Sequence, residues 1–158
     1  MILATVGTQL PFPRLMKALD RIANRHDLRV VAQCCEATEG LSIEMRPFIK
    51  PAEFDALAGQ ATVLVGHAGI GTIIGAERLS KPLILFPRRA SLGEHRNEHQ
   101  LATARAMAER PGIHVAWDED ELESLLTKAE LSPLESGKSP TLSGLIGTVS
   151  AFVMSDVR

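Results

Sequence analysis

The chain has 158 residues, 45% of them hydrophobic and 23% charged, which indicates one globular domain and excludes a disordered, collagen-like or coiled-coil protein. Its formal net charge of −2 does not indicate a nucleic-acid-binding protein.

Cys34 and Cys35 are sequence neighbours that would form only a strained disulfide, which favours a reducing compartment. No apolar run approaches the ~20 residues that cross a bilayer, and the start lacks the basic segment of a signal peptide. We therefore expect a cytoplasmic protein that reaches the membrane face only through a partner.

Short apolar runs alternate with helical patterns along the chain. Strands are predicted at residues 2–6, 28–32, 62–65, 83–86 and 113–115, and helices at about residues 12–23, 52–58, 70–79, 97–109 and 121–126. The acidic run at 118–121 suits the positive end of the last of these helices. The alternation predicts βαβ units, and hence an α/β fold with a Rossmann-like parallel sheet and helices on both faces. We expect one domain over residues 1–158, with a loop at 132–144 and a terminal helix at roughly 142–154 that packs back on the domain or contacts a partner.

Ligands of such sheets bind beyond the carboxyl ends of the strands. The loop after Val65 reads Gly66-His67-Ala68-Gly69-Ile70-Gly71-Thr72 and opens a helix. The first amide groups of a helix lack internal partners and carry positive partial charge, and small residues leave them open to a phosphate. The segment therefore predicts an anion site, while the alternative is a tight turn whose histidine only caps the helix or fills the core. It is neither a P-loop, because no Gly-Lys-Ser/Thr occurs, nor a dinucleotide fingerprint, whose glycine order differs.

Two further loops carry polar groups to the same edge of the sheet. Gly7 and Thr8 follow the first strand. The segment 87–100 follows a later strand and holds groups suited to phosphates or sugar hydroxyls, namely Arg88, Arg89, His95, Asn97, His99 and Gln100. Residues 77–117 carry seven basic against four acidic residues, so this part of the chain is where an anionic ligand is expected.

The same segment offers a rival function. His95-Arg96-Asn97-Glu98-His99 matches the H-x-x-E-H pattern of inverted zinc proteases, in which His95 and His99 would hold the metal and Glu98 would act as the base. Such a short match often arises by chance and needs a third ligand. Because His95 falls at the junction of loop and helix, a zinc hydrolase is the less favoured alternative.

In this order and spacing, the three segments resemble the C-terminal, donor-binding half of GT-B glycosyltransferases, specifically glycosyltransferase family 28. The match runs from His67–Ile74 through Lys81-Pro82-Leu83 to Pro87-Arg88 and the stretch 94–100. The opening Thr5-Val6-Gly7-Thr8 is similar to that of the family's small stand-alone members. Those members are the catalytic subunit of the dolichol-linked N-acetylglucosaminyltransferase and the matching subunit of bacterial two-component exopolysaccharide transferases. The resemblance covers about residues 1–110 and implies a single half of a GT-B fold that binds a UDP-sugar.

The resemblance also implies roles for individual residues. The expected substrate-binding residues are Gly7, Thr8, His67, Ala68, Gly69, Gly71, Thr72, Arg88, Asn97, His99 and Gln100, of which His99 and Gln100 match a pair that reaches the donor sugar hydroxyls. No catalytic residue is evident, and the candidates are His67, His95 and His99. Related families bind the ribose with an acid three positions after Thr72. That position is Gly75 here, so either the nearby Glu77 does not bind ribose or another group does.

The implied mechanism needs no metal or other cofactor, because a helix start, histidine and arginine would stabilise the leaving diphosphate. It also needs a general base for the acceptor hydroxyl. In two-domain relatives the acceptor side comes from the N-terminal half, for which 158 residues leave no room. We therefore expect one subunit of a split enzyme whose membrane-anchored partner binds a lipid-linked acceptor, with N-acetylglucosamine or glucuronic acid as the transferred sugar. The alternative from a different class is a non-catalytic nucleotide-sugar-binding protein.

Overall fold

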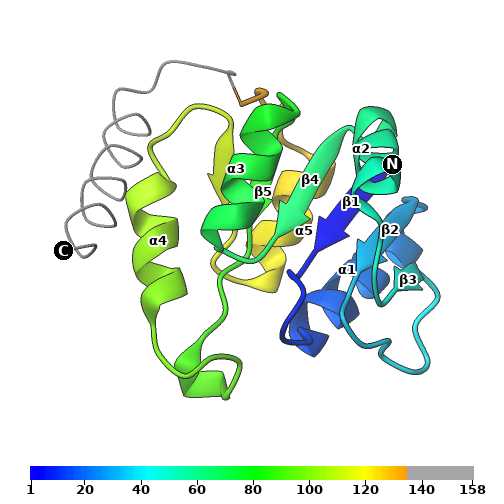
Figure 1. Cartoon of the computed structure of the whole chain (residues 1–158), viewed down its shortest axis with the longest axis horizontal. Coiled ribbons are helices and arrows are strands. Elements are labelled where there is room, and N and C mark those ends of the chain that lie inside the picture. Colours follow the sequence, from blue (N-terminus) through cyan, green and yellow to red (C-terminus); the bar gives the residue numbers. More distant parts are fainter. Residues whose placement is uncertain (135–158) are drawn as a thin grey trace, which may run out of the picture.

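The computed structural model describes residues 1–134, which form a six-stranded, entirely parallel sheet between two layers of helices (Figure 1). The strands are β1 (Ile2–Thr5), β2 (Val30–Gln33), β3 (Glu44–Arg46), β4 (Val63–Gly66), β5 (Leu83–Leu85) and β6 (Ile113–Val115), in the order β3-β2-β1-β4-β5-β6. The helices are α1 (Pro13–His26), α2 (Pro51–Gln60), α3 (Ile70–Arg78), α4 (His99–Met107) and α5 (Glu119–Thr127), with a 3-10 turn η1 at Ala90–Leu92.

Alternate side chains of the central strands supply two separate cores, one on each face of the sheet. Ile2 and Ala4 of β1 face the core that α1 and α5 cover, through residues such as Leu19 and Leu122. Leu3 faces the other core, to which α2, α3 and α4 contribute Ala58, Ile73, Ala76 and Ala104. A sheet buried on both faces explains why its strands are continuous apolar runs. The predicted Rossmann-like α/β fold is confirmed.

The sequence-based boundaries need one addition and several small shifts. The three-residue edge strand β3 was not predicted, and the strand expected at 28–32 begins instead at Val30. The helix expected from about residue 97 begins at His99. The predicted terminal helix at roughly 142–154 lies outside the described residues. Within residues 1–134, no helix has the length and apolar character needed to span a membrane.

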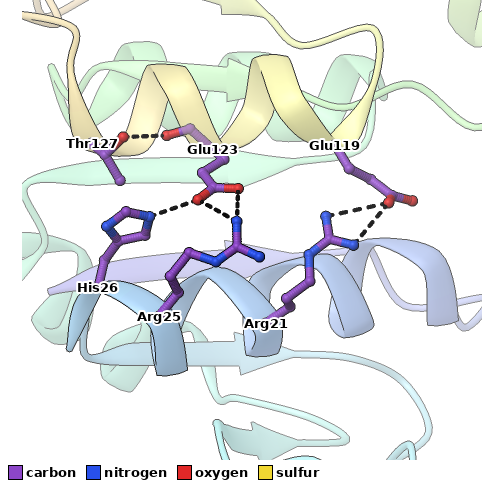
Figure 2. Close-up of polar contacts among 6 residues, drawn as sticks. All are labelled: Arg21, Arg25, His26, Glu119, Glu123 and Thr127. Carbon is purple, nitrogen blue, oxygen red and sulfur yellow. Dashed lines mark hydrogen bonds and ion pairs between the residues drawn. The ribbon is translucent and has the colours of Figure 1, made fainter.

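Ion pairs join the two helices on one face of the sheet (Figure 2). Glu123 of α5 accepts hydrogen bonds from Arg25 at 3.0 Å and lies 2.6 Å from the His26 ring nitrogen, while Arg21 approaches Glu119 at 3.4 Å. The hydrogen bond to His26, followed by that to Arg25, lowers the pKa of the Glu123 carboxyl below its usual value. These contacts fasten α5 across α1, on the face opposite α3.

Candidate functional site

A cavity of about 560 Å³ opens at the carboxyl ends of the strands. At its centre, below the start of α3, it is lined by Gly7, Thr8, His67, Gly71 and Thr72. Toward β2 and β3 it is lined by Gln33, Phe48, Phe54 and Asp55, and toward β5 by Arg88, His95 and Gln100. Three loops that are far apart in sequence therefore meet in one site, where parallel α/β sheets bind ligands.

The start of α3 presents unpaired main-chain donors. Gly69 is the N-cap residue. Because glycine has no side chain, no side-chain hydrogen bond caps the helix. The Gly69 carbonyl accepts from the Thr72 and Ile73 amides at 3.1 and 3.2 Å. Within residues 1–134, the amides of Ile70 and Gly71 make no hydrogen bond to protein atoms. Two free amides at the positive end of a helix are the donors that a phosphate requires.

The His67 ring lies between the two glycine-containing loops. A β-carbon on Gly7 would stand 3.1 Å from its Cε1, and a β-carbon on Gly69 would overlap its Nε2. Burial, followed by the positive charge of Arg88, lowers the pKa of His67 to about 4, although a hydrogen bond to the Thr5 backbone acts in the opposite direction. His67 is therefore a neutral imidazole at pH 7, and its Nδ1 lies 3.4 Å from the Thr72 hydroxyl.

The Arg88 guanidinium is engaged by the protein itself. It is 2% exposed and donates to the carbonyls of Pro11 and Leu10 at 2.7 Å and to that of Val6 at 3.3 Å. It also lies 4.3 Å from the centre of the Phe12 ring. These bonds occupy the group that sequence reasoning assigned to a phosphate. Arg88 borders the cavity, but its hydrogen bonds hold the loop after β1 in place.

A second arginine fixes the loop after β5. Arg14 of α1 donates to both carboxylate oxygens of Glu94, at 2.6 and 2.9 Å, and to the Pro87 carbonyl at 2.9 Å. Glu94 also accepts from the Arg89 amide at 2.9 Å. Neither member of this pair was predicted as part of the site, because the two residues lie 80 positions apart in sequence.

The predicted residues of the 95–100 segment are divided between the cavity and the surface. His95 and Gln100 line the cavity, and the Gln100 Oε1 accepts from the Arg88 amide at 3.1 Å. Asn97 and His99 lie outside the lining, and His99 is exposed at the first residue of α4. Ala68 and Gly69 are likewise outside it, with Ala68 buried in the core.

The zinc alternative is not supported by this placement. Because α4 begins at His99, His95 does not share a helical turn with it. The Glu98 carboxylate accepts from the Ser91 amide instead. In the described part of the chain, no three His, Cys, Asp or Glu side chains gather as a metal site would require.

The expected ribose acid is absent from its position, and another acid lines the cavity. Gly75 borders the cavity, and a β-carbon there would meet nothing within 4 Å. Glu77 is buried and pairs with Arg110 at 2.7 Å, outside the cavity lining. Asp55 of α2 does line the cavity, and the Arg78 guanidinium bonded to it lowers the pKa of its carboxyl.

Sequence reasoning missed the side of the cavity near β2 and β3. Gln33 is buried and donates to the Gly7 carbonyl at 3.3 Å, while its Oε1 accepts from the Ile49 amide at 3.1 Å. Phe48 is 63% exposed beside it. A glutamine that ends an apolar strand was the one available signal, because buried polar side chains are usually retained for a hydrogen bond.

Solved structures that align with this chain include glycosyltransferases. The NMR structure of ALG13 aligns with a TM-score of 0.63 and 17% identity, covering 91% of this chain and 93% of that one. Acinetobacter baumannii MurG aligns with a TM-score of 0.58 and 19% identity, covering 80% of this chain and 40% of that one. Streptomyces sp. SF2575 SsfS6, solved with thymidine diphosphate, aligns with a TM-score of 0.55 and 20% identity, covering 81% of this chain and 33% of that one. The chain thus spans less than half of MurG and SsfS6, and its fold is that of one half of a GT-B glycosyltransferase.

The sequence itself identifies the family. Residues 1–140 match the Glycosyltransferase family 28 C-terminal domain, so the chain belongs to that family. The resemblance inferred from the three loops is thereby confirmed, and so is the general class of activity, glycosyl transfer. No curated protein matches the sequence.

Proposed function

We propose that the chain is the donor-binding subunit of a UDP-sugar-dependent glycosyltransferase. It would transfer a hexose derivative, N-acetylglucosamine or glucuronic acid, to a lipid-linked sugar in polysaccharide or glycan biosynthesis. The observation that carries the donor-binding part is the pair of free amides at Ile70 and Gly71 at the tip of α3, where Gly71 lines the cavity. Family membership supports the reaction class.

The sides of the cavity support one direction for the donor. With the diphosphate at the tip of α3, the Phe48 and Phe54 side offers apolar rings to a flat base. The opposite side offers His95 and Gln100 to the hydroxyls of a sugar. Gln100 can donate there through its side-chain NH2, while the Arg88 amide bonded to its oxygen holds the side chain in place.

Charge stabilisation in this proposal comes from fixed groups of the protein. As the bond between the sugar C1 and the diphosphate breaks, negative charge grows on the leaving oxygen. The amides of Ile70 and Gly71 and the dipole of α3 are aligned before the reaction, so they stabilise that charge without reorganising. The His67 ring is neutral at pH 7 and its single N–H is already bonded to the Thr5 backbone, so it borders the diphosphate without adding a positive charge. No metal or other cofactor is needed for this step.

The partner and the acceptor belong to the same proposal. The family 28 domain is one half of a GT-B fold. In this proposal a membrane-anchored partner supplies the acceptor half, which places this chain at the cytoplasmic face of the membrane. Apolar side chains beside the cavity, among them Leu10 at 48% exposure and Ile74 at 46%, are available for such a contact. Co-purification with the product of a neighbouring gene, followed by assay for transfer, tests this part.

UDP-induced thermal stabilisation tests donor binding. A ligand at 100 times its Kd stabilises the folded state by about 2.7 kcal/mol, which raises the melting temperature of a domain this size by several degrees. Thr72→Ala should reduce the UDP-induced shift strongly, because this side chain lines the cavity beside the free amides. Thr62→Ala, at an exposed threonine outside the cavity, is the matched control and should keep the shift. A wild-type protein that UDP does not stabilise contradicts the proposal.

A further inference from the structure

The histidine-rich stretch 95–99, which donor binding leaves largely unused, contains one group suited to proton transfer. Of the three histidines considered from sequence, His67 is enclosed by Gly7 and Gly69, and His99 is exposed outside the cavity. His95 alone combines a place in the cavity lining with an open ring edge. It lies on the side of Gln100, where the proposed donor orientation puts the sugar.

A neighbouring side chain fixes which ring nitrogen of His95 carries the proton. Its Nδ1 lies 3.1 Å from the Asn97 Oδ1 and 3.2 Å from the Asn97 carbonyl oxygen. Both atoms are acceptors, so Nδ1 must donate, and the neutral ring then carries no proton on Nε2. Across residues 1–134 no protein group is bonded to that Nε2, which leaves its lone pair available.

Asn97 is itself held in place. Its Oδ1 also accepts from the His99 amide at 3.2 Å, at the start of α4. The acceptor that orients His95 is therefore tied to the end of a helix, and a rigid support of this kind is what a general base requires.

We propose that His95 Nε2 is the general base of the transfer and that Asn97 is its positioning residue. This inference rests on the proposed function. The acceptor hydroxyl oxygen forms a bond to C1 of the donor sugar, and its proton moves to His95 Nε2. The bond between C1 and the diphosphate oxygen breaks, and its electron pair leaves with UDP. The imidazolium then returns its proton to solvent. The base thus comes from the donor-binding chain rather than from the acceptor-binding partner.

The kinetic test separates binding from chemistry in the full-length chain. Wild type and His95→Gln are compared for UDP affinity by calorimetry and for UDP release from UDP-N-acetylglucosamine and UDP-glucuronic acid, with water as the acceptor. The variant should bind UDP within about twofold of wild type and release UDP about 10²- to 10⁴-fold more slowly, the usual contribution of a general base. Imidazole added to His95→Ala should restore part of the rate. A His95→Gln protein that releases UDP at the wild-type rate overturns the assignment.

The tautomer test needs no turnover. Long-range proton–nitrogen NMR of the histidine-labelled chain should show the His95 proton on Nδ1, with Nε2 unprotonated, at neutral pH. Asn97→Ala removes the side-chain acceptor but keeps the carbonyl of residue 97, so it should shift the proton toward Nε2 only in part. Asn97→Asp, which keeps both acceptor oxygens, should preserve the wild-type tautomer. A wild-type ring protonated on Nε2 overturns the proposal. If wild type binds UDP but releases none from either donor, the NMR measurement of the His95 tautomer alone decides whether the proposal stands. Failure to bind UDP at all would instead contradict the proposed function.

Discussion

His67 occupies the space beside Gly7, so that a β-carbon on Gly7 would stand 3.1 Å from the ring Cε1. Gly7 also has a φ of +83°, a conformation that side-chain-bearing residues rarely adopt. The loops after β1 and β4 are therefore brought together around one imidazole. Glycine at positions 7 and 69 therefore leaves the space that the His67 ring fills.

Gly69→Ala should destabilise the protein and weaken UDP binding together. The new methyl group would lie 3.0 Å from the Cε1 and Cδ2 of His67 and overlap its Nε2, so the ring must move. We expect a loss of about 1–3 kcal/mol, the usual cost of overpacking, measured by urea unfolding.

Gly71→Ala is the matched control for that experiment. Nothing stands within 4 Å of a β-carbon there, and alanine improves the helix by up to about 1 kcal/mol. Its methyl group would nevertheless stand in the cavity wall. The melting temperature without ligand should rise while the UDP-induced shift falls. A full UDP shift in this variant would show that the phosphate does not approach the tip of α3.

Arg88→Met should cost about 2–4 kcal/mol, because three backbone carbonyls would lose their buried donor. Arg96→Met, at an exposed arginine of the same loop, should change stability by less than about 0.5 kcal/mol. Chemical denaturation of both variants provides the comparison. Equal stabilities would mean that the guanidinium does not brace the loop after β1.

Stability should depend on pH through His67. Its pKa falls from an ordinary 6.5 to about 4 on folding, so between these values the unfolded chain binds more protons than the folded one. The contribution of the neutral His67 ring to the free energy of unfolding is fully present above pH 6.5 and is lost as the pH falls toward 4. The size of this contribution is at most about 3 kcal/mol. Urea midpoints from pH 4 to 7 should therefore rise more steeply for wild type than for His67→Gln. Parallel curves would place the ring in a solvated environment.

Glu123→Gln should weaken the attachment of α5 to α1 in a salt-dependent manner. The carboxylate pairs with Arg25 and His26, and such exposed pairs are screened at high ionic strength. The melting temperature of the variant should fall below that of wild type in low salt, and the difference should shrink in 1 M NaCl. A difference independent of salt would indicate lost packing rather than lost charge.

The sequence was sufficient for the elements that are buried and periodic. Apolar runs such as Val63–Gly66 are long enough to identify the central strands, and the acidic run at 118–121 does begin a helix, since the Asp118 side chain accepts from the Glu121 amide at 2.8 Å. The edge strand β3 escaped notice because Glu44–Arg46 is short and partly exposed, with two charged residues of three. Its hydrogen bonds to β2, rather than its side chains, make it a strand.

The site was predictable where the backbone carries the chemistry. The glycine-rich loop before α3 could be placed from spacing alone, and the structure brings its Gly71 and Thr72 to the cavity. Pairs formed across the fold could not be found in this way. Arg88 was expected to face a ligand, yet it turns to the carbonyls of the loop after β1 because burial requires it to be paired. Asp55 enters the cavity from α2, which carries no motif.

The strand order has a consequence for synthesis. β1 is made first but lies in the middle of the sheet, with β4 as its second neighbour. While the chain leaves the ribosome, β1 keeps one unpaired edge until residues 63–66 have emerged, and the loop that follows it lacks its brace until Arg88 has been made. The nascent chain thus exposes an unpaired strand edge until β4 has been made, a period in which chaperones would have most to protect.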